Sequence, residues 1–179
     1  KAVELQPEYA PAQFRLAEML YSVGSYHQAL KHARLALDNG YDELRSRIIL
    51  GTLLYKVKQF EKALETFHEA EKRFPGNAAI CNNLGNLYKD IGRYEKAEWY
   101  FNASLEADPS YVLAYSNLFF AKHYDPKATQ NEIVKLAKSW GERFSLSSLP
   151  TPLNKKDMAK PLRVGLISSG FGMHPVGQM

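Results

Sequence analysis

Residues 82–109 read NNLGNLYKDIGRYEKAEWYFNASLEADP, and this stretch determines the fold that we expect for the chain. One apolar pattern at helical spacing stops near Gly92, and a second begins at Tyr94 and stops before Pro109. Glycine is favoured just past the end of a helix, whereas proline cannot continue one. The stretch therefore predicts two helices that are joined by a short turn.

The same arrangement recurs when the sequence is shifted by 34 residues. Three blocks align at Leu16, Leu50 and Leu84; Ala17, Gly51 and Gly85; Leu20, Leu54 and Tyr88; Tyr26, Phe60 and Tyr94; and Ala29, Ala63 and Ala97. The blocks close with Tyr41, Pro75 and Pro109, and Pro7 marks the end of an earlier block. Small side chains at two of these positions let antiparallel helices approach closely, and the aromatic residue after the turn fills the gap between them.

The period and the residue classes resemble the tetratricopeptide repeat, a helix–turn–helix unit. We expect an all-α fold over residues 1–111, a right-handed α-solenoid with three full repeats at 10–43, 44–77 and 78–111. The predicted helices lie near residues 10–23, 26–38, 44–57, 60–73, 78–91 and 94–106. Lys58 stands where Gly24 and Gly92 end the first helix in the other blocks, so the middle turn must accommodate a residue with a side chain.

The composition is that of an ordinary globular protein. The chain has 179 residues, of which 45% are hydrophobic and 23% are charged, and this excludes a disordered chain. Cys81 is the single cysteine, so an internal disulfide is impossible; this fits a cytoplasmic location, and we expect Cys81 to be a small buried residue. The histidines outside the C-terminal motif show no metal-ligand spacing, so we expect no metal site among them. No cofactor is expected either.

The net charge of +4 arises in the last third of the chain. Residues 1–111 carry 14 basic and 15 acidic side chains, whereas residues 112–179 carry 9 basic and 4 acidic ones. A basic segment can bind nucleic acid or an anionic membrane, but a solvated linker explains it more simply. No apolar run approaches the length of a membrane span. We therefore expect neither a nucleic-acid partner nor a membrane.

Two asparagines, Asn83 and Asn117, lie 34 residues apart and are expected on the same face of the stack. In such an array the first helices form a concave face that grips extended peptides, and an amide can both donate to and accept from a peptide backbone. The alternative is that both side chains only cap or bridge neighbouring helices. Arg15 and Ile49 occupy the equivalent places in the first two blocks, so the asparagine row is short.

A fourth block begins at Val112 and is predicted to be partial, because His123–Pro126 breaks the helix before the turn is due. Thr129 and Glu132 have the spacing of a capping box, which predicts a fresh helix. Its apolar stripe is Ile133, Leu136, Ala137, Trp140 and Phe144. We expect residues 112–144 to cap the array; a partner-binding groove is the alternative. Residues 145–161, rich in serine, proline and lysine, are predicted to form a linker.

Residues 162–168 are short, largely apolar and β-branched, which is typical of a strand in a parallel sheet. The glycine-rich turn Ser169–Pro175 follows, but Pro175 stands at the third glycine of the dinucleotide fingerprint. Residues 162–179 therefore predict the first strand and loop of a truncated α/β domain. A lone strand cannot form a sheet, so we expect the chain to be part of a longer protein that continues past Met179.

The repeats, the segment Tyr115–Pro126 and the RVGLISSGFGMHP motif at residues 163–175 occur in this order. Together they resemble the O-linked N-acetylglucosamine (O-GlcNAc) transferase family. Repeats of this kind also occur in many adaptors, so the last motif is the specific one. Gly170 stands where the eukaryotic motif usually has aspartate, which is closer to some bacterial members.

The resemblance implies a two-lobed glycosyltransferase that transfers a sugar from UDP-GlcNAc to a serine or threonine hydroxyl of a protein, without a metal. It places His174 in the active-site cleft as a candidate base, with Pro175 beside it; a histidine that only orders the loop is the alternative. It implies that Asn83 and Asn117 bind the acceptor peptide, that Pro175 also contacts substrate, and that the repeats can mediate homo-oligomers.

The donor site is the part of this enzyme that the 179 residues are expected to lack. Most of the residues that bind UDP-GlcNAc are expected to follow Met179, so no donor-binding residue is assigned within the chain. The isolated chain is therefore expected to be inactive. A non-catalytic tetratricopeptide adaptor is the alternative function.

Overall fold

The structure, a computed structural model, describes residue 6 and residues 8–144, and all regular structure within them is helical. Eight helices lie in this described part: α2 (Ala10–Ser22), α3 (Tyr26–Asp38), α4 (Leu44–Lys56), α5 (Phe60–Arg73), α6 (Ala78–Asp90), α7 (Tyr94–Ala107), α8 (Val112–Tyr124) and α9 (Gln130–Phe144). The chain divides into a unit of residues 1–144 and a unit of residues 145–179. The predicted linker and the predicted strand and loop, which together run from Ser145 to Met179, lie outside the described residues.

The first six of these helices begin and end within one residue of the predicted positions. The turns explain this agreement: Gly24 and Gly92 adopt φ values of +78° and +75°, the left-handed conformation in which glycine has no steric cost. Lys58 takes the same conformation, with φ of +64°, so the middle turn keeps its shape despite the side chain. Pro75 follows the end of α5 by two residues.

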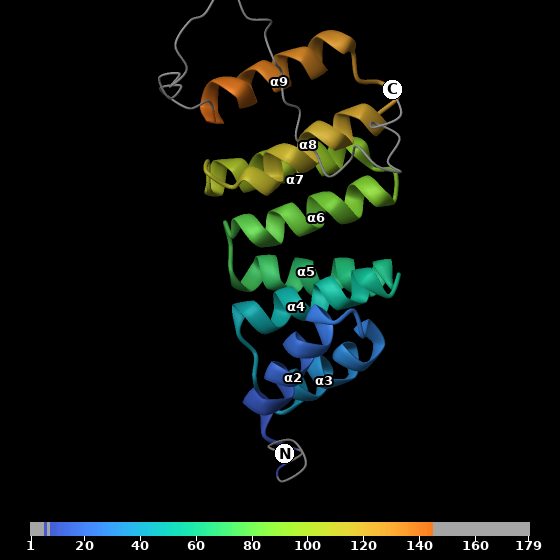
Figure 1. Cartoon of the computed structure of the whole chain (residues 1–179), viewed down its shortest axis with the longest axis vertical. Helices are drawn as coiled ribbons and strands as arrows, with labels where there is room; N and C mark the ends of the chain where they lie inside the picture. Colours follow the sequence, from blue (N-terminus) through green and yellow to red (C-terminus); the bar gives the residue numbers. More distant parts are fainter. Residues whose placement is uncertain (1–5, 7, 145–179) are drawn as a thin grey trace, which may run out of the picture. The chain divides into compact units, whose positions relative to one another are not determined.

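The helices are stacked in chain order from blue α2 to orange α9 (Figure 1), and their contacts divide α2 to α8 into two layers. We call α2, α4, α6 and α8 the first-helix layer. Each of these helices packs against the next one in the layer, and it also packs against the second helix of its own pair. The helices α3, α5 and α7 contact first helices but not one another. Successive repeats therefore lie closer together on the side of the first-helix layer.

Within each pair, the closest approach of the two helices occurs at a small residue. A Cβ atom added to Gly85 would lie 2.6 Å from the ring of Phe101, and one added to Gly51 would lie 2.6 Å from the ring of Phe67. Both phenylalanines are at most 1% exposed, so their rings have no free space into which they can move. The predicted role of the small residues is thereby confirmed.

The first pair solves the same packing problem with smaller side chains. Ala17 occupies the register position of Gly51 and Gly85, and Ala33 occupies that of Phe67 and Phe101. Both alanines are at most 2% exposed. In the first pair, the methyl group of Ala17 therefore faces the methyl group of Ala33. In the second and third pairs, a glycine faces a phenyl ring.

The prediction that the fourth block breaks early is wrong. α8 has 13 residues, as α2, α4 and α6 do, and it ends at Tyr124, which is 34 residues after the end of α6. Asp125 and Pro126 therefore stop the helix where the repeat requires its turn, with Pro126 taking the place of a turn glycine. The capping box is confirmed, because Thr129 N donates to Glu132 Oε2 at 2.7 Å and Glu132 N donates to Thr129 Oγ1 at 3.3 Å.

The fourth pair departs from the pattern in its packing. Phe119 aligns with Gly85 and Gly51, so a large side chain stands where the second helix should approach. Its ring packs edge-on at 4.5 Å from the ring of His123. In agreement with this obstruction, no side chain described in α9 is fully buried. Leu136 packs against the core, as the predicted stripe requires, whereas Trp140 is 41% exposed.

Two identical substitutions in helices are expected to have opposite effects on stability. Gly85→Ala should lower the free energy of unfolding by about 1–2 kcal/mol, because the new methyl group overlaps the buried Phe101 ring. Gly141→Ala should raise it by up to about 1 kcal/mol, since its Cβ would meet nothing within 4 Å and alanine favours helix. Urea denaturation followed by circular dichroism measures both, and equal effects would contradict this packing.

Candidate functional site

Three asparagines lie together on the first-helix layer, at the junction of α6 and α8. Asn83 Nδ2 donates to the carbonyl oxygen of Ala79 in its own helix at 2.9 Å. The side chain is half-buried, and within the described part of the chain no donor reaches its Oδ1 atom. Asn83 therefore keeps an acceptor that an incoming backbone N–H group could use.

Asn117 connects two repeats. Its Nδ2 atom donates to Asn82 Oδ1 across α6 and α8 at 2.9 Å. Asn82 is only 5% exposed, so this bond satisfies an acceptor that water scarcely reaches. The bridging alternative thus describes part of what Asn117 does, whereas peptide binding by Asn83 and Asn117 stays a prediction.

Asn82 was not among the predicted site residues, although the sequence contains a signal for it. Phe14 and Ile48 precede Asn82 at the same register position, so a polar residue stands where the earlier repeats have an apolar one. A buried polar side chain needs a partner. Asn117, which the next repeat places alongside, provides that partner.

An ion-pair group lies at the other end of the same layer, between α2 and α4. The Glu18 carboxylate accepts from Arg15 Nη1 at 2.9 Å and pairs with Arg45 Nη2 at 2.5 Å. The Arg15 and Arg45 side chains are 69% and 66% exposed, whereas that of Glu18 is 15% exposed. One carboxylate thus lies beneath two guanidinium groups, which face solvent.

Between these groups, a tyrosine links α4 to α6. The Tyr55 hydroxyl donates to Asp90 Oδ2 at 2.5 Å, and Lys89 Nζ lies 3.2 Å from Asp90 Oδ1. Burial, together with the adjacent Asp90 carboxylate, raises the pKa of the Tyr55 hydroxyl well above its ordinary value. Tyr55 therefore remains a hydrogen-bond donor at neutral pH, and its bond ties neighbouring repeats together.

Two histidines have partners within the helix stack, and Cys81 is buried as predicted. His32 Nδ1 lies 2.6 Å from Gln13 Oε1, and His68 Nε2 lies 3.0 Å from the Tyr88 hydroxyl. Cys81 is 5% exposed, and burial raises the pKa of its thiol.

No cluster of side chains able to hold a metal ion occurs among residues 8–144. The helices of that same part are too short and too polar to cross a membrane. The predicted site residues His174 and Pro175 lie outside the described residues, as does Met179, after which most of the donor site was expected. The placement of the catalytic and donor sites therefore stays a prediction.

A family model described as tetratricopeptide repeat matches residues 54–118. The chain is also 35% identical over 98 residues to the probable UDP-N-acetylglucosamine–peptide N-acetylglucosaminyltransferase SPINDLY of Solanum lycopersicum, covering 55% of this chain and 10% of that protein. It is 26% identical over 90 residues to the probable transferase SEC of Arabidopsis thaliana, covering 50% of this chain and 9% of the other. The chain thus spans about a tenth of the length of these relatives.

Solved structures give the same answer for the fold. An O-GlcNAc transferase of Thermobaculum terrenum matches with a TM-score of 0.72 at 26% identity, covering 94% of this chain and 33% of that one. YrrB, a tetratricopeptide protein described as having an unusual peptide-binding site, matches with a TM-score of 0.64 at 23% identity, covering 77% of this chain and 72% of that one. The chain therefore carries tetratricopeptide repeats that are homologous to those of O-GlcNAc transferase-like proteins.

The two predicted peptide-binding asparagines should differ in their effect on stability. Asn117→Ala leaves the buried Asn82 oxygen without its donor, and we expect it to lower the free energy of unfolding by about 1–3 kcal/mol. Asn83→Ala removes only a bond to its own helix at a half-buried site, and we expect a loss below about 1 kcal/mol. Urea denaturation of both variants tests this, and a larger loss for Asn83→Ala would contradict the assigned bonds.

Proposed function

We propose that this chain is the protein-binding arm of a protein O-glycosyltransferase, which transfers GlcNAc from UDP-GlcNAc to serine or threonine side chains. The observation that carries the proposal is the homology of its repeats to those of transferases, together with the Thermobaculum terrenum structure, whose similarity covers 94% of this chain. The motif at residues 163–175 adds support from the sequence.

In this proposal the acceptor protein lies along the first-helix layer. Successive first helices contact one another whereas the second helices do not, which supports a concave binding face at the first-helix layer. Asn83 offers a free acceptor there, and Asn117 lies one repeat further along. Contacts to a peptide backbone do not select side chains, so such a surface can hold many acceptor sequences.

His174 and Pro175 carry the proposed contribution of this chain to catalysis. An imidazole with an ordinary pKa near 6.5 can exchange hydrogen bonds with an acceptor hydroxyl at neutral pH. Pro175 restricts the backbone beside it. UDP-GlcNAc is the proposed donor, and no metal is proposed.

A non-catalytic adaptor that binds a peptide is the second candidate. The similarity to YrrB favours it, because that protein is described by its peptide-binding site. Both candidates use the same surface, so transfer of the sugar is what separates them.

The test is a transfer assay with radiolabelled UDP-GlcNAc, using the longest natural polypeptide that contains these 179 residues and a mixture of protein acceptors. We expect labelled serine or threonine from the wild-type protein, and a loss of about 100-fold or more in His174→Ala, as for a residue that handles a proton. The chain that ends at Met179 should transfer nothing by itself.

His27→Ala is the matched control, because His27 is an exposed histidine on α3. It should leave transfer unchanged. Full activity of His174→Ala would remove His174 from the active site. If the longest polypeptide binds peptides but transfers no sugar, the proposed enzymatic function is wrong and the adaptor function is favoured.

A further inference from the structure

Charge is divided unequally between the two kinds of helix. The first-helix layer carries six basic and two acidic side chains, whereas α3, α5 and α7 together carry six basic and eight acidic ones. Part of the basic excess is neutralised inside the stack, since Arg47 pairs with Asp42 at 2.5 Å and Lys122 pairs with Glu98 at 2.8 Å. The remaining positive charge faces solvent.

The exposed positive charge is concentrated at α2 and α4. Arg15, Arg45 and Lys56 outnumber the Glu18 and Glu43 carboxylates on this surface, so it keeps a net positive charge. The Arg15 and Arg45 side chains are about two-thirds exposed. Exposed ion pairs are weak. A guanidinium group can therefore exchange Glu18 for a carboxylate of a partner at little cost.

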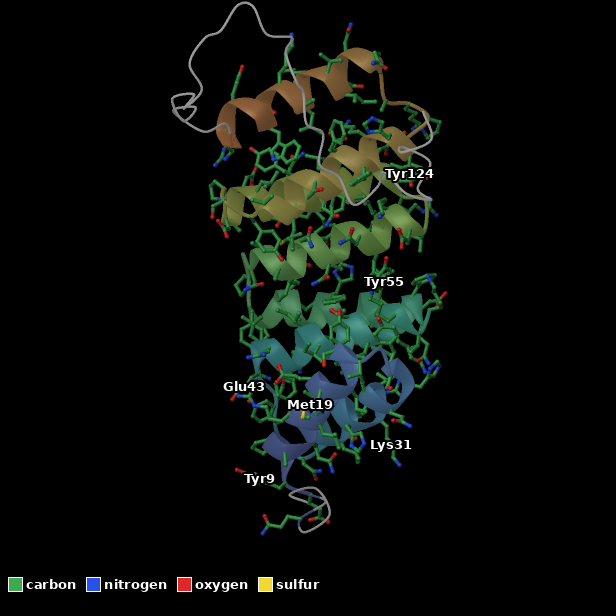
Figure 2. All side chains as sticks on the ribbon, in the orientation of Figure 1. Tyr9, Met19, Lys31, Glu43, Tyr55 and Tyr124 are labelled. Atoms are coloured by element: carbon green, nitrogen blue, oxygen red, sulfur yellow. The ribbon has the colours of Figure 1, made fainter. Side chains whose placement is uncertain are left out.

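The same surface becomes apolar at α8. Leu113, Phe120 and Tyr124 are 59%, 55% and 64% exposed, and they occupy the register positions that Arg45, Thr52 and Lys56 hold in α4. Figure 2 labels Tyr124 at the end of α8. The opposite side of α8 is apolar as well, because it buries Ala114, Leu118 and Ala121. A helix that is apolar on two opposite sides normally has both of them covered.

We propose that the first-helix layer binds an extended peptide with carboxylates over α2 and α4 and apolar side chains over α8. Its backbone passes the Asn83 and Asn117 amides between these ends. The basic surface at α2 and α4 supplies the charge complementarity that selects an acidic partner. This inference rests on the peptide-binding part of the proposed function.

The dimensions suit a short peptide. Three steps between contacting helices, each of about 8–10 Å, separate α2 from α8. Roughly nine extended residues span this distance of about 30 Å. A peptide of about 12 residues therefore reaches both ends of the surface.

The experiment uses the 179-residue chain and fluorescence anisotropy of three labelled peptides. The first has acidic residues at one end and leucine and phenylalanine at the other; the second replaces its acids with amides; the third replaces its apolar residues with serine. Each is made in both sequence orders. We expect the first to bind about tenfold more tightly than either of the others, and increasing salt should weaken only the two acidic peptides.

Substitutions test the basic end and the apolar end of the surface separately. Arg15→Gln with Arg45→Gln should weaken binding of the first peptide about tenfold and leave the second unchanged. Phe120→Gln should weaken the first and leave the third unchanged. The matched control is Lys31→Gln with Arg34→Gln, which removes two exposed charges from α3 and should change nothing. Thermal unfolding of each variant shows whether it is folded.

Three results would overturn the inference. The acidic and amide peptides could bind equally well, with both affinities reduced by Asn83→Ala. That result would refute the preference for acidic peptides but would still support peptide binding by this surface. Absence of binding by all peptides would contradict both. The chain could also associate with itself. If Phe120→Gln abolishes this association and the peptides do not compete with it, the occupant of the α8 surface is a second copy of the chain.

Discussion

The contact of a phenyl ring with a glycine backbone determines how the second and third helix pairs pack. Phe67 and Phe101 lie where any side chain on Gly51 or Gly85 would overlap them, and both rings are fully buried. Close packing of this kind fixes the distance between the helices, and therefore where the next first helix begins. The surface that we propose for peptide binding depends on that distance, because successive first helices must be close enough for Asn117 to reach Asn82.

The glycine position also explains where regularity stops. In α8 the equivalent residue is Phe119, so the final pair keeps the length and register of a repeat but not its packing. α9 consequently covers the core with half-buried side chains such as Leu136. The structure thus separates two properties that occur together in the earlier repeats: the register of a helix, which its turn determines, and its close packing, which the small residue determines.

Most of the described fold could be predicted from the sequence, because its signals are local. Gly24, Gly92 and Pro75 lie just past helix ends, so the ends of the first six helices were predicted within one residue. The register of α8 was missed because Pro126 performs the task that a glycine performs elsewhere. Asn82 was missed because its role depends on a partner from the next repeat, which a single helix does not reveal. The unequal charge of the two layers could not be predicted, because the contacts between helices are needed to assign each helix to a layer.

A double-mutant cycle between Gly85 and Phe101 tests the packing on which the rest depends. Phe101→Ala should cost about 3–5 kcal/mol of unfolding free energy. Phe101→Ala combined with Gly85→Ala recreates the Ala17 and Ala33 arrangement of the first pair, so the double variant should be at least about 1 kcal/mol more stable than the sum of the single effects predicts. Single effects that add within about 0.5 kcal/mol would show that ring and glycine are not coupled, and would contradict this account of the repeat.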